Sequence, residues 1–112
     1  MLVAFDPDIE FRGAPDLLGP DQDPVAYGHE GYREFWRYWL AAFEDLWLEP
    51  EELLALGDKV LVTTDLRGHG TGSGVGTSRR LFQLFQFRQG LIVKQRDFTD
   101  RAEALEAVGL SE

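Results

Sequence analysis

A carboxylate near the end of the chain is the first candidate for chemistry. Asp97 lies in the run LIVKQRDF (residues 91–98), whose composition is typical of a β-strand. Alternate residues of a strand share a face, so Asp97 shares one with Val93 and Gln95, which we assign to the interior. Burial beside Trp36 or Trp39 would raise the pKa of this carboxylate and make it a general base. The alternative is a structural role, in which Asp97 caps the next turn or pairs with an arginine: Arg79, Arg96 or Arg101.

Two further polar residues are weaker candidates. Gln83 lies among apolar residues in the run RRLFQLFQF (residues 79–87), and a buried amide needs hydrogen-bond partners. It therefore binds either a backbone group or a ligand. His69 lies in a glycine-rich linker and is either a proton shuttle at the mouth of a pocket or an exposed turn residue. Thr63 and Asp65, in the run KVLVTTDL (residues 59–66), are weaker still.

An aromatic helix is predicted over residues 29–43. Its apolar residues recur with the i, i+3, i+4, i+7 spacing of one buried stripe: Tyr32, Phe35, Trp36, Trp39, Leu40 and Phe43. We expect this helix to lie across a sheet, with Tyr32, Trp36 and Trp39 in the core and, as a second use of the same face, lining a pocket. Phe85, on the strand that carries Gln83, is a further candidate for contact with a ligand.

The sheet itself is predicted from three strand-like runs, residues 59–66, 79–87 and 91–98, which form an antiparallel meander. The linker between the first two has glycine at every second position from 68 to 76, which permits a sharp bend. It has no phosphate-binding register. Apolar residues on both faces of the strands predict cover on both sides. One cover is the aromatic helix, and the other is a candidate surface for a second subunit.

The remaining segments complete one domain over residues 1–112. MLVAF (residues 1–5) resembles the last turn of a helix, and IEFRG (residues 9–13) a short strand. Prolines and aspartates predict a loop over residues 14–28. A strand at 46–49 is expected to precede a helical turn at 51–56, because Pro50 suits the first position of a helix. The tail, residues 99–110, predicts a capped short helix that ends at Gly109.

Composition excludes several partners and compartments. The net charge of −9 opposes binding to nucleic acid or to an anionic membrane. The sequence has no cysteine, and its two histidines lack metal-ligand spacing, so we expect no metal site. No signal peptide or membrane-spanning run is apparent, so we expect a soluble, cytoplasmic protein.

Five segments together carry a family resemblance: FDPDIEFRG, GHEGYREFW, PEELLALGDKV, GTGSGV and DRAEALEAVGL. In this order they resemble the SnoaL-like (polyketide-cyclase-like) family of the nuclear-transport-factor-2-like superfamily, which includes ketosteroid isomerase. The resemblance implies an α+β fold with a cone-shaped, strongly bent antiparallel sheet wrapped around helices, commonly as a homodimer. Members usually have a full helix before the segment that matches FDPDIEFRG. We expect that N-terminal helix to be truncated here, and therefore an open pocket or a partner subunit in the gap.

The resemblance also implies a buried acid or base in an otherwise apolar cone. We therefore predict a protein that binds an apolar small molecule in an internal pocket, without a cofactor. In the enzyme version Asp97 is the base, and Gln83, His69 or Tyr32 orients the substrate for isomerisation, cyclisation, dehydration or hydrolysis. The alternative is a non-catalytic ligand-binding or dimerisation module.

Overall fold

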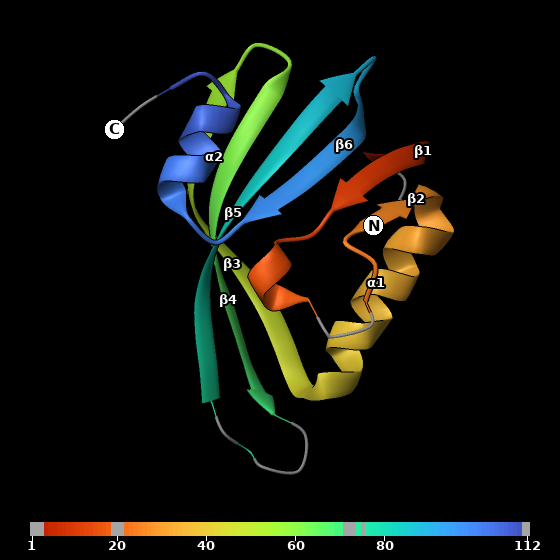
Figure 1. Ribbon diagram of the computed structural model, residues 1–112, viewed down its shortest axis with the longest axis vertical. Coiled ribbons are helices and arrows are strands. Elements are labelled where there is room, and N and C mark those ends of the chain that lie inside the picture. Colours follow the sequence, from red (N-terminus) through yellow and green to blue (C-terminus); the bar gives the residue numbers. More distant parts are fainter. Residues whose placement is uncertain (1–3, 19–21, 71–73, 75, 111–112) are drawn as a thin grey trace.

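The computed structural model describes residues 4–18, 22–70, 74 and 76–110, without the side chains of positions 16 and 39. These residues form one six-stranded sheet in the order β2-β1-β6-β5-β4-β3, with two α-helices and a short 3-10 helix (Figure 1). The strands are β1 (Phe5–Arg12), β2 (Val25–Tyr27), β3 (Phe43–Leu56), β4 (Lys59–Gly70), β5 (Gly76–Arg88) and β6 (Leu91–Phe98). The helices are α1 (Gly28–Ala42), α2 (Arg101–Ala107) and the 3-10 helix η2 (Pro15–Leu17). No helix in these ranges is long and apolar enough to span a membrane.

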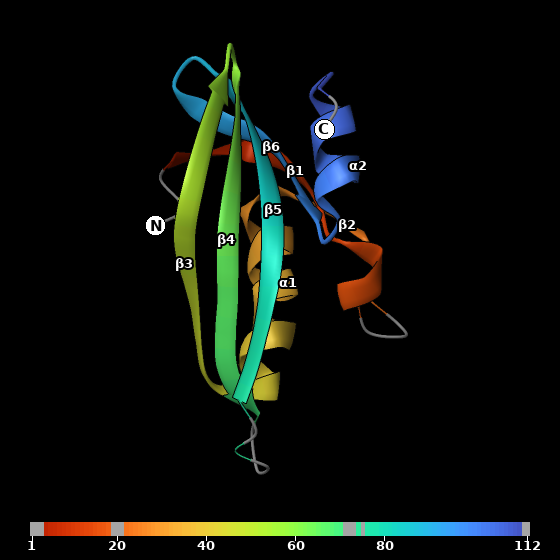
Figure 2. The same cartoon turned by 90° about the vertical axis from the view of Figure 1, so that its left-hand side faces the viewer.

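The sheet is strongly bent and remains open. Strands β3, β4 and β5 run side by side, whereas β6 and β1 turn across their direction (Figure 2). Strand β1 pairs in parallel with β6, and the other neighbouring strands in the described sheet pair antiparallel. Strands β2 and β3 form its two edges. The predicted α+β fold with a strongly bent sheet is therefore confirmed, but the sheet is mixed rather than antiparallel, because β1 pairs in parallel with β6.

The two α-helices cover opposite faces of this sheet. On the concave face, the Phe11 ring of β1 packs on Tyr32 and Phe35 of α1, with ring centroids 5.2 Å and 4.5 Å away. On the convex face, Ala104 and Leu105 of α2 join a buried cluster with three strand residues: Leu61, Phe82 and Phe98. The predicted aromatic helix therefore covers one face. Helix α2 covers part of the other face, which the sequence predicted as a candidate surface for a second subunit.

The predicted helical turn at residues 51–56 is wrong. These residues belong to β3, which continues without a helix from Phe43 to Leu56. Proline has no N–H to donate to a ladder, but β3 is an edge strand and pairs only with β4. The register shifts between Pro50 and Glu52, so the proline lies at an irregularity that the strand absorbs.

The predicted helical turn near the N-terminus is wrong at Phe5, which begins strand β1. Positions 1–3 lie outside the described residues. Strand β1 is longer than the predicted run of 9–13, because Phe5 pairs with Ile92 of β6. The predicted loop of residues 14–28 contains the short strand β2, which pairs with the second half of β1.

The glycine linker lies largely within regular strands. Gly68 and Gly70 end β4, and Gly76 begins β5, so the hairpin extends further than the apolar runs predicted; position 72 lies outside the described residues. At Gly68 a Cβ atom would lie 2.5 Å from the backbone oxygen of Asp45 in β3. This glycine is therefore required for close approach of β3 and β4.

We predict that Gly68→Ala lowers the free energy of unfolding by about 2 kcal/mol or more, because the new Cβ overlaps backbone that cannot rotate away. Gly76→Ala is the matched control, since its Cβ would lie 3.8 Å from the nearest His69 ring atom. Urea denaturation of both variants makes the comparison. Equal stability of the two variants would contradict the assigned close approach.

Candidate functional site

Asp97 lies on the concave face of the sheet, below α1. Strand β6 lies between β1 and β5; Asp97 lies directly opposite Gln83 of β5 and one residue beyond the last β1–β6 pair, Arg12 with Arg96. Its side chain is buried, with 6 % of the residue exposed. The sequence prediction that Asp97 faces the interior therefore agrees with the structure, and the arginine pairings offered as its alternative are not among the ion pairs of the described residues.

The Gln95 side chain connects this carboxylate to α1. Gln95 Nε2 donates a hydrogen bond to Asp97 Oδ1 at 3.1 Å. The Tyr32 hydroxyl donates to Gln95 Oε1 at 2.9 Å. Because the tyrosine occupies the amide oxygen, the NH2 group of Gln95 is directed to the carboxylate.

On the β5 side of Asp97, the Gln83 side chain is oriented by a hydroxyl group, as Gln95 is. Gln83 lies directly opposite Asp97 in the β5–β6 register, and its side chain hydrogen-bonds the carboxylate. The Thr64 hydroxyl of β4 donates to Gln83 Oε1 at 2.9 Å. The result is one continuous polar chain across the concave face, formed by Tyr32, Gln95, Asp97, Gln83 and Thr64.

Burial dominates the electrostatics of this chain. Desolvation raises the pKa of Asp97 from 3.8 to about 7, and the hydrogen bonds from Gln95 and Gln83 lower it by less. Burial also raises the pKa of Tyr32 to about 12, and the nearby Asp97 charge acts in the same direction. Asp97 thus exchanges a proton near neutral pH, whereas Tyr32 stays protonated and remains a donor.

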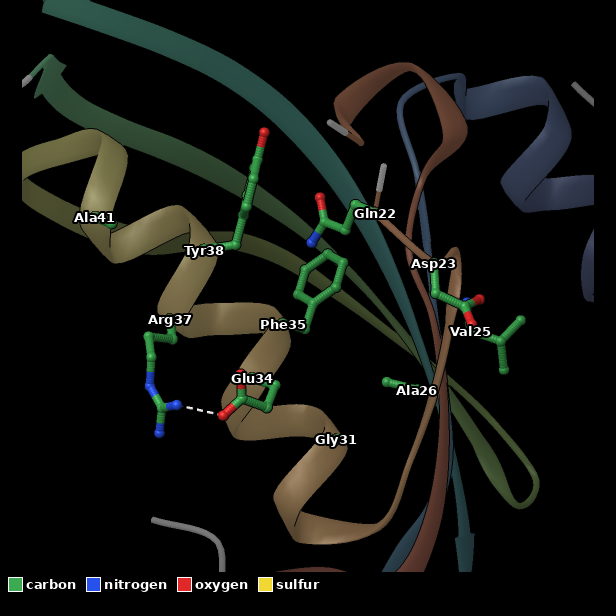
Figure 3. A pocket seen from close by; sticks show the side chains of 10 residues that line it. All are labelled: Gln22, Asp23, Val25, Ala26, Gly31, Glu34, Phe35, Arg37, Tyr38 and Ala41. Atoms are coloured by element: carbon green, nitrogen blue, oxygen red, sulfur yellow. Dashed lines mark hydrogen bonds and ion pairs between the residues drawn. The ribbon is translucent and has the colours of Figure 1, made fainter. Parts of the chain in front are cut away.

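A large hollow lies on another side of α1. It has a volume of about 870 Å³ and lies between α1 and the segment of residues 22–26 (Figure 3). The rings of Phe35 and Tyr38 project from α1 towards it, and Val25 and Ala26 of β2 form its other wall. Its walls are largely apolar, as expected for a small-molecule site. It does not reach Asp97.

A smaller hollow does reach Asp97. Its volume is about 170 Å³, and it lies where β1 and β6 end, lined by Gly13, Phe98 and Asp97 among others. The Phe35 ring lines the larger hollow and lies close to Gly13, which lines the smaller one: a Cβ on Gly13 would lie 3.0 Å from the ring. Phe35 therefore lines the larger hollow and adjoins the smaller one through Gly13.

Most of the predicted substrate-binding residues gather on the concave face. Phe85 lies directly opposite Gln95 in the β5–β6 register. Trp36 packs against Tyr32 with ring centroids 6.4 Å apart. The side chain of Trp39 lies outside the described part of the structure.

His69 is not brought to this site. It alternates with Leu66 and Gly68 along β4 and so lies on the convex side, together with Arg67 and Asp65. Its Nδ1 lies 2.8 Å from Asp45 Oδ1, and this bond, the largest cause, lowers the pKa of Asp45. The weaker candidates Thr63 and Asp65 share the convex side, and Asp65 pairs with Arg67 at 3.0 Å.

Two members of the polar chain, Gln95 and Thr64, were missed as candidates. Alternation alone had placed Gln95 beside Asp97. Thr64 was missed because the sequence does not specify its pairing with Leu81. That pairing determines which face of the strand is buried. In the described ranges no three His, Cys, Asp or Glu side chains cluster as metal ligands do.

A family model described as a SnoaL-like domain matches residues 1–95. The chain belongs to the SnoaL-like family. The structure is similar to that of TerC co-crystallised with polyporic acid, with a TM-score of 0.78, 20% identity, and coverage of 96% of this chain and 82% of TerC. An NTF2-like protein of unknown function from Burkholderia pseudomallei K96243 gives the same TM-score and identity, with coverage of 96% and 81%.

A putative SnoaL-like polyketide cyclase from Jannaschia sp. CCS1 gives a TM-score of 0.72 at 21% identity, with coverage of 97% of this chain and 76% of that one. No protein with a curated description matches the sequence significantly. At these identities the solved structures establish the shared fold, and the predicted family resemblance is confirmed.

We predict that Asp97→Asn stabilises this SnoaL-like domain in a pH-dependent way. Below pH 4 the acid is protonated in both folded and unfolded states, so the variant changes little. Between pH 4 and 7 the unfolded state loses the proton while the folded state keeps it, so wild-type stability falls. Above pH 7 the shift from 3.8 to about 7 corresponds to roughly 4 kcal/mol of lost stability, which the neutral amide avoids.

Urea denaturation of wild type and Asp97→Asn at pH 4 and pH 8 measures this difference. A variant that gains no more stability at pH 8 than at pH 4 would contradict the assigned desolvation. Asp58→Asn, at an exposed position, is the control for the loss of one carboxylate.

Proposed function

We propose that this SnoaL-like protein binds an apolar small molecule between α1 and the bent sheet and that Asp97 acts on it as a general base, without a cofactor. The observation that carries the proposal is the buried Asp97 carboxylate, whose pKa burial raises to about 7. An ionised carboxylate kept in such a place costs several kcal/mol, and perturbed groups of this kind are concentrated at functional sites.

The chemistry best suited to this arrangement is proton transfer next to a carbonyl group. An Asp97 oxygen takes a proton from the carbon beside the carbonyl, and the electrons of that C–H bond form an enolate. The protonated Asp97 then returns the proton to the same carbon or to another one, which completes an exchange or an isomerisation. A base with a pKa near 7 is efficient in both directions at neutral pH.

Gln95 and Gln83 are positioning residues in this scheme. Both amides donate to Asp97, and the hydroxyls of Tyr32 and Thr64 fix their orientation. Removing one hydroxyl frees the amide to rotate, so the proposal expects Tyr32→Phe to shift the pH profile of the reaction rather than abolish it. Asp97 is the residue that touches the substrate.

The large hollow supplies the binding surface. Its apolar walls match an apolar ligand, and the Phe35 ring adjoins Gly13, which lines the smaller hollow together with Asp97. Rotation of this ring admits the reacting end of a ligand to Asp97. The second candidate function is a non-catalytic binding module. If the Phe35 ring does not rotate, a ligand in the larger hollow does not reach Asp97, and this second function is favoured.

Hydrogen–deuterium exchange of 2-tetralone in D2O tests the reaction directly. The probe is a bicyclic apolar ketone whose protons next to the carbonyl exchange when a base removes them. We predict exchange above the buffer rate, with an apparent pKa near 7, and a decrease of about 100-fold or more in Asp97→Asn. Proton NMR follows the loss of the methylene signal.

His69→Gln is the matched control, because His69 lies on the convex face and the exchange rate should not change. Binding of 2-tetralone without exchange would reject the base and leave the binding module. Exchange that persists in Asp97→Asn would also contradict the role of Asp97.

We also propose that the predicted homodimer forms through β3. This edge strand exposes large apolar side chains on both faces: Trp47, Leu48, Leu53 and Leu54. Such an edge favours association with a second copy. We predict that Leu53→Glu shifts the sedimentation coefficient from dimer to monomer, whereas Leu110→Glu, at another exposed leucine, does not. A wild-type monomer at all concentrations would contradict the proposal.

A further inference from the structure

Four cations converge on the convex face, behind the site described above. The strand register places Arg12 beside Arg96, and Glu10 beside Lys94. Lys94 lies opposite Gln86, which in turn lies opposite Lys59. The cations therefore occupy two adjacent cross-strand rows. Arg12 and Arg96 lie about 5 Å apart on neighbouring strands, whereas Lys94 and Lys59 lie two strands apart, about 10 Å, with Gln86 between them.

These cations surround a hollow rather than a flat surface. Its volume is about 250 Å³, and it is lined by Glu10, Arg12, Lys59, Leu84, Gln86, Lys94, Gln95, Arg96 and Ala107. Ala107 is the last residue of α2, so the end of that helix forms one wall. Four cations face the single carboxylate of Glu10 in this lining.

The four cations are not used in ion pairs within the described part of the chain. Elsewhere arginines are paired: Arg67 with Asp65 at 3.0 Å and Arg80 with Glu51 at 3.1 Å. Arg12, Lys59, Lys94 and Arg96 form no such pair with a described residue.

The backbone carbonyl groups at the nearby end of α2 already have other hydrogen-bond partners. Carbonyls in its last turn accept backbone bonds from Val108, Gly109 and Leu110 at 2.9–3.1 Å. Arg96 is held in place from another direction, because its guanidinium lies 4.6 Å from the centre of the Phe98 ring. The hollow thus has at least one fixed, unpaired donor group.

Arg12 and Arg96 are like charges directly opposite each other on neighbouring strands, and such a pair is destabilising. In a chain with a net charge of −9, four cations gathered around one hollow are also unexpected on composition alone. A bound anion with more than one negative charge removes the repulsion, and guanidinium groups bind phosphate oxygens with paired, charge-assisted hydrogen bonds.

We propose that this hollow, which we name the convex anion site, binds a small phosphorylated molecule through Arg12, Lys59, Lys94 and Arg96. The volume is sufficient for a phosphate or diphosphate group. The site lies on the face of the sheet opposite Asp97, so it is independent of the proposed acid–base chemistry and would survive its failure.

Titration with inorganic pyrophosphate at low ionic strength tests the proposal. Isothermal calorimetry should show one saturable site, and NMR should place the shifted amides on β6 and at the end of α2. Arg96→Gln and Lys94→Gln should each weaken binding by about tenfold or more, the effect of losing one charge-assisted hydrogen bond. Raised salt should weaken binding further.

Arg33→Gln is the matched control, since Arg33 is exposed on α1 and its loss changes the net charge by the same amount. Unchanged binding in this variant supports a built site. No saturable binding to the wild type, or equal weakening in all three variants, would overturn the proposal.

Sedimentation with vesicles that contain phosphatidic acid distinguishes the source of the phosphate group. Pyrophosphate binding without co-sedimentation identifies a soluble phosphorylated ligand, the result that we expect from the negative charge of the chain. Co-sedimentation that Arg96→Gln abolishes supports the same phosphate site with a lipid headgroup as its source. Co-sedimentation that persists in Arg96→Gln and Lys94→Gln would place phosphate recognition elsewhere and contradict the proposal.

Discussion

The burial of one carboxylate is the constraint on which the concave face depends. Asp97 is held by two amides, and each amide is oriented by a hydroxyl, so five side chains from α1, β4, β5 and β6 act as one polar unit. Within an apolar interior such a unit is tolerated only when its members are satisfied. The hydrogen bonds lower the pKa of Asp97 but do not cancel desolvation, so the carboxylate remains easy to protonate at neutral pH.

The topology of the sheet explains why this position exists. Strand β6 is flanked by β1 and β5, and the bend of the sheet brings the aromatic face of α1 over it. Asp97 therefore lies on the face that α1 covers, with β5 directly beside it and Gln95 linking it to Tyr32. The same bend directs the convex face outward, where α2 covers the apolar rows and leaves the cationic rows around a hollow. One curved sheet thus presents two chemically different surfaces.

Much of this arrangement was predictable, and the failures have physical causes. Alternation along residues 91–98 placed Asp97 inside, and the helical period predicted α1 to within one residue at each end. The helical turn at 51–56 failed because pairing with β4 outweighed the local preference of Pro50 and the two glutamates. Thr64 could not be assigned, because a register is set by tertiary pairing. His69 was separated from the site by strand alternation that the glycine-rich linker obscured.

The pKa of Asp97 is the quantity that tests the account most directly. In a sample labelled with ¹³C in aspartate, the side-chain carboxyl shift of Asp97 can be followed from pH 3 to pH 9 and assigned by comparison with Asp97→Asn. The account predicts a midpoint near 7, about three units above the reference value of 3.8. A midpoint near 4 would show that the carboxylate is solvated in the folded protein and would contradict its role as a buried base.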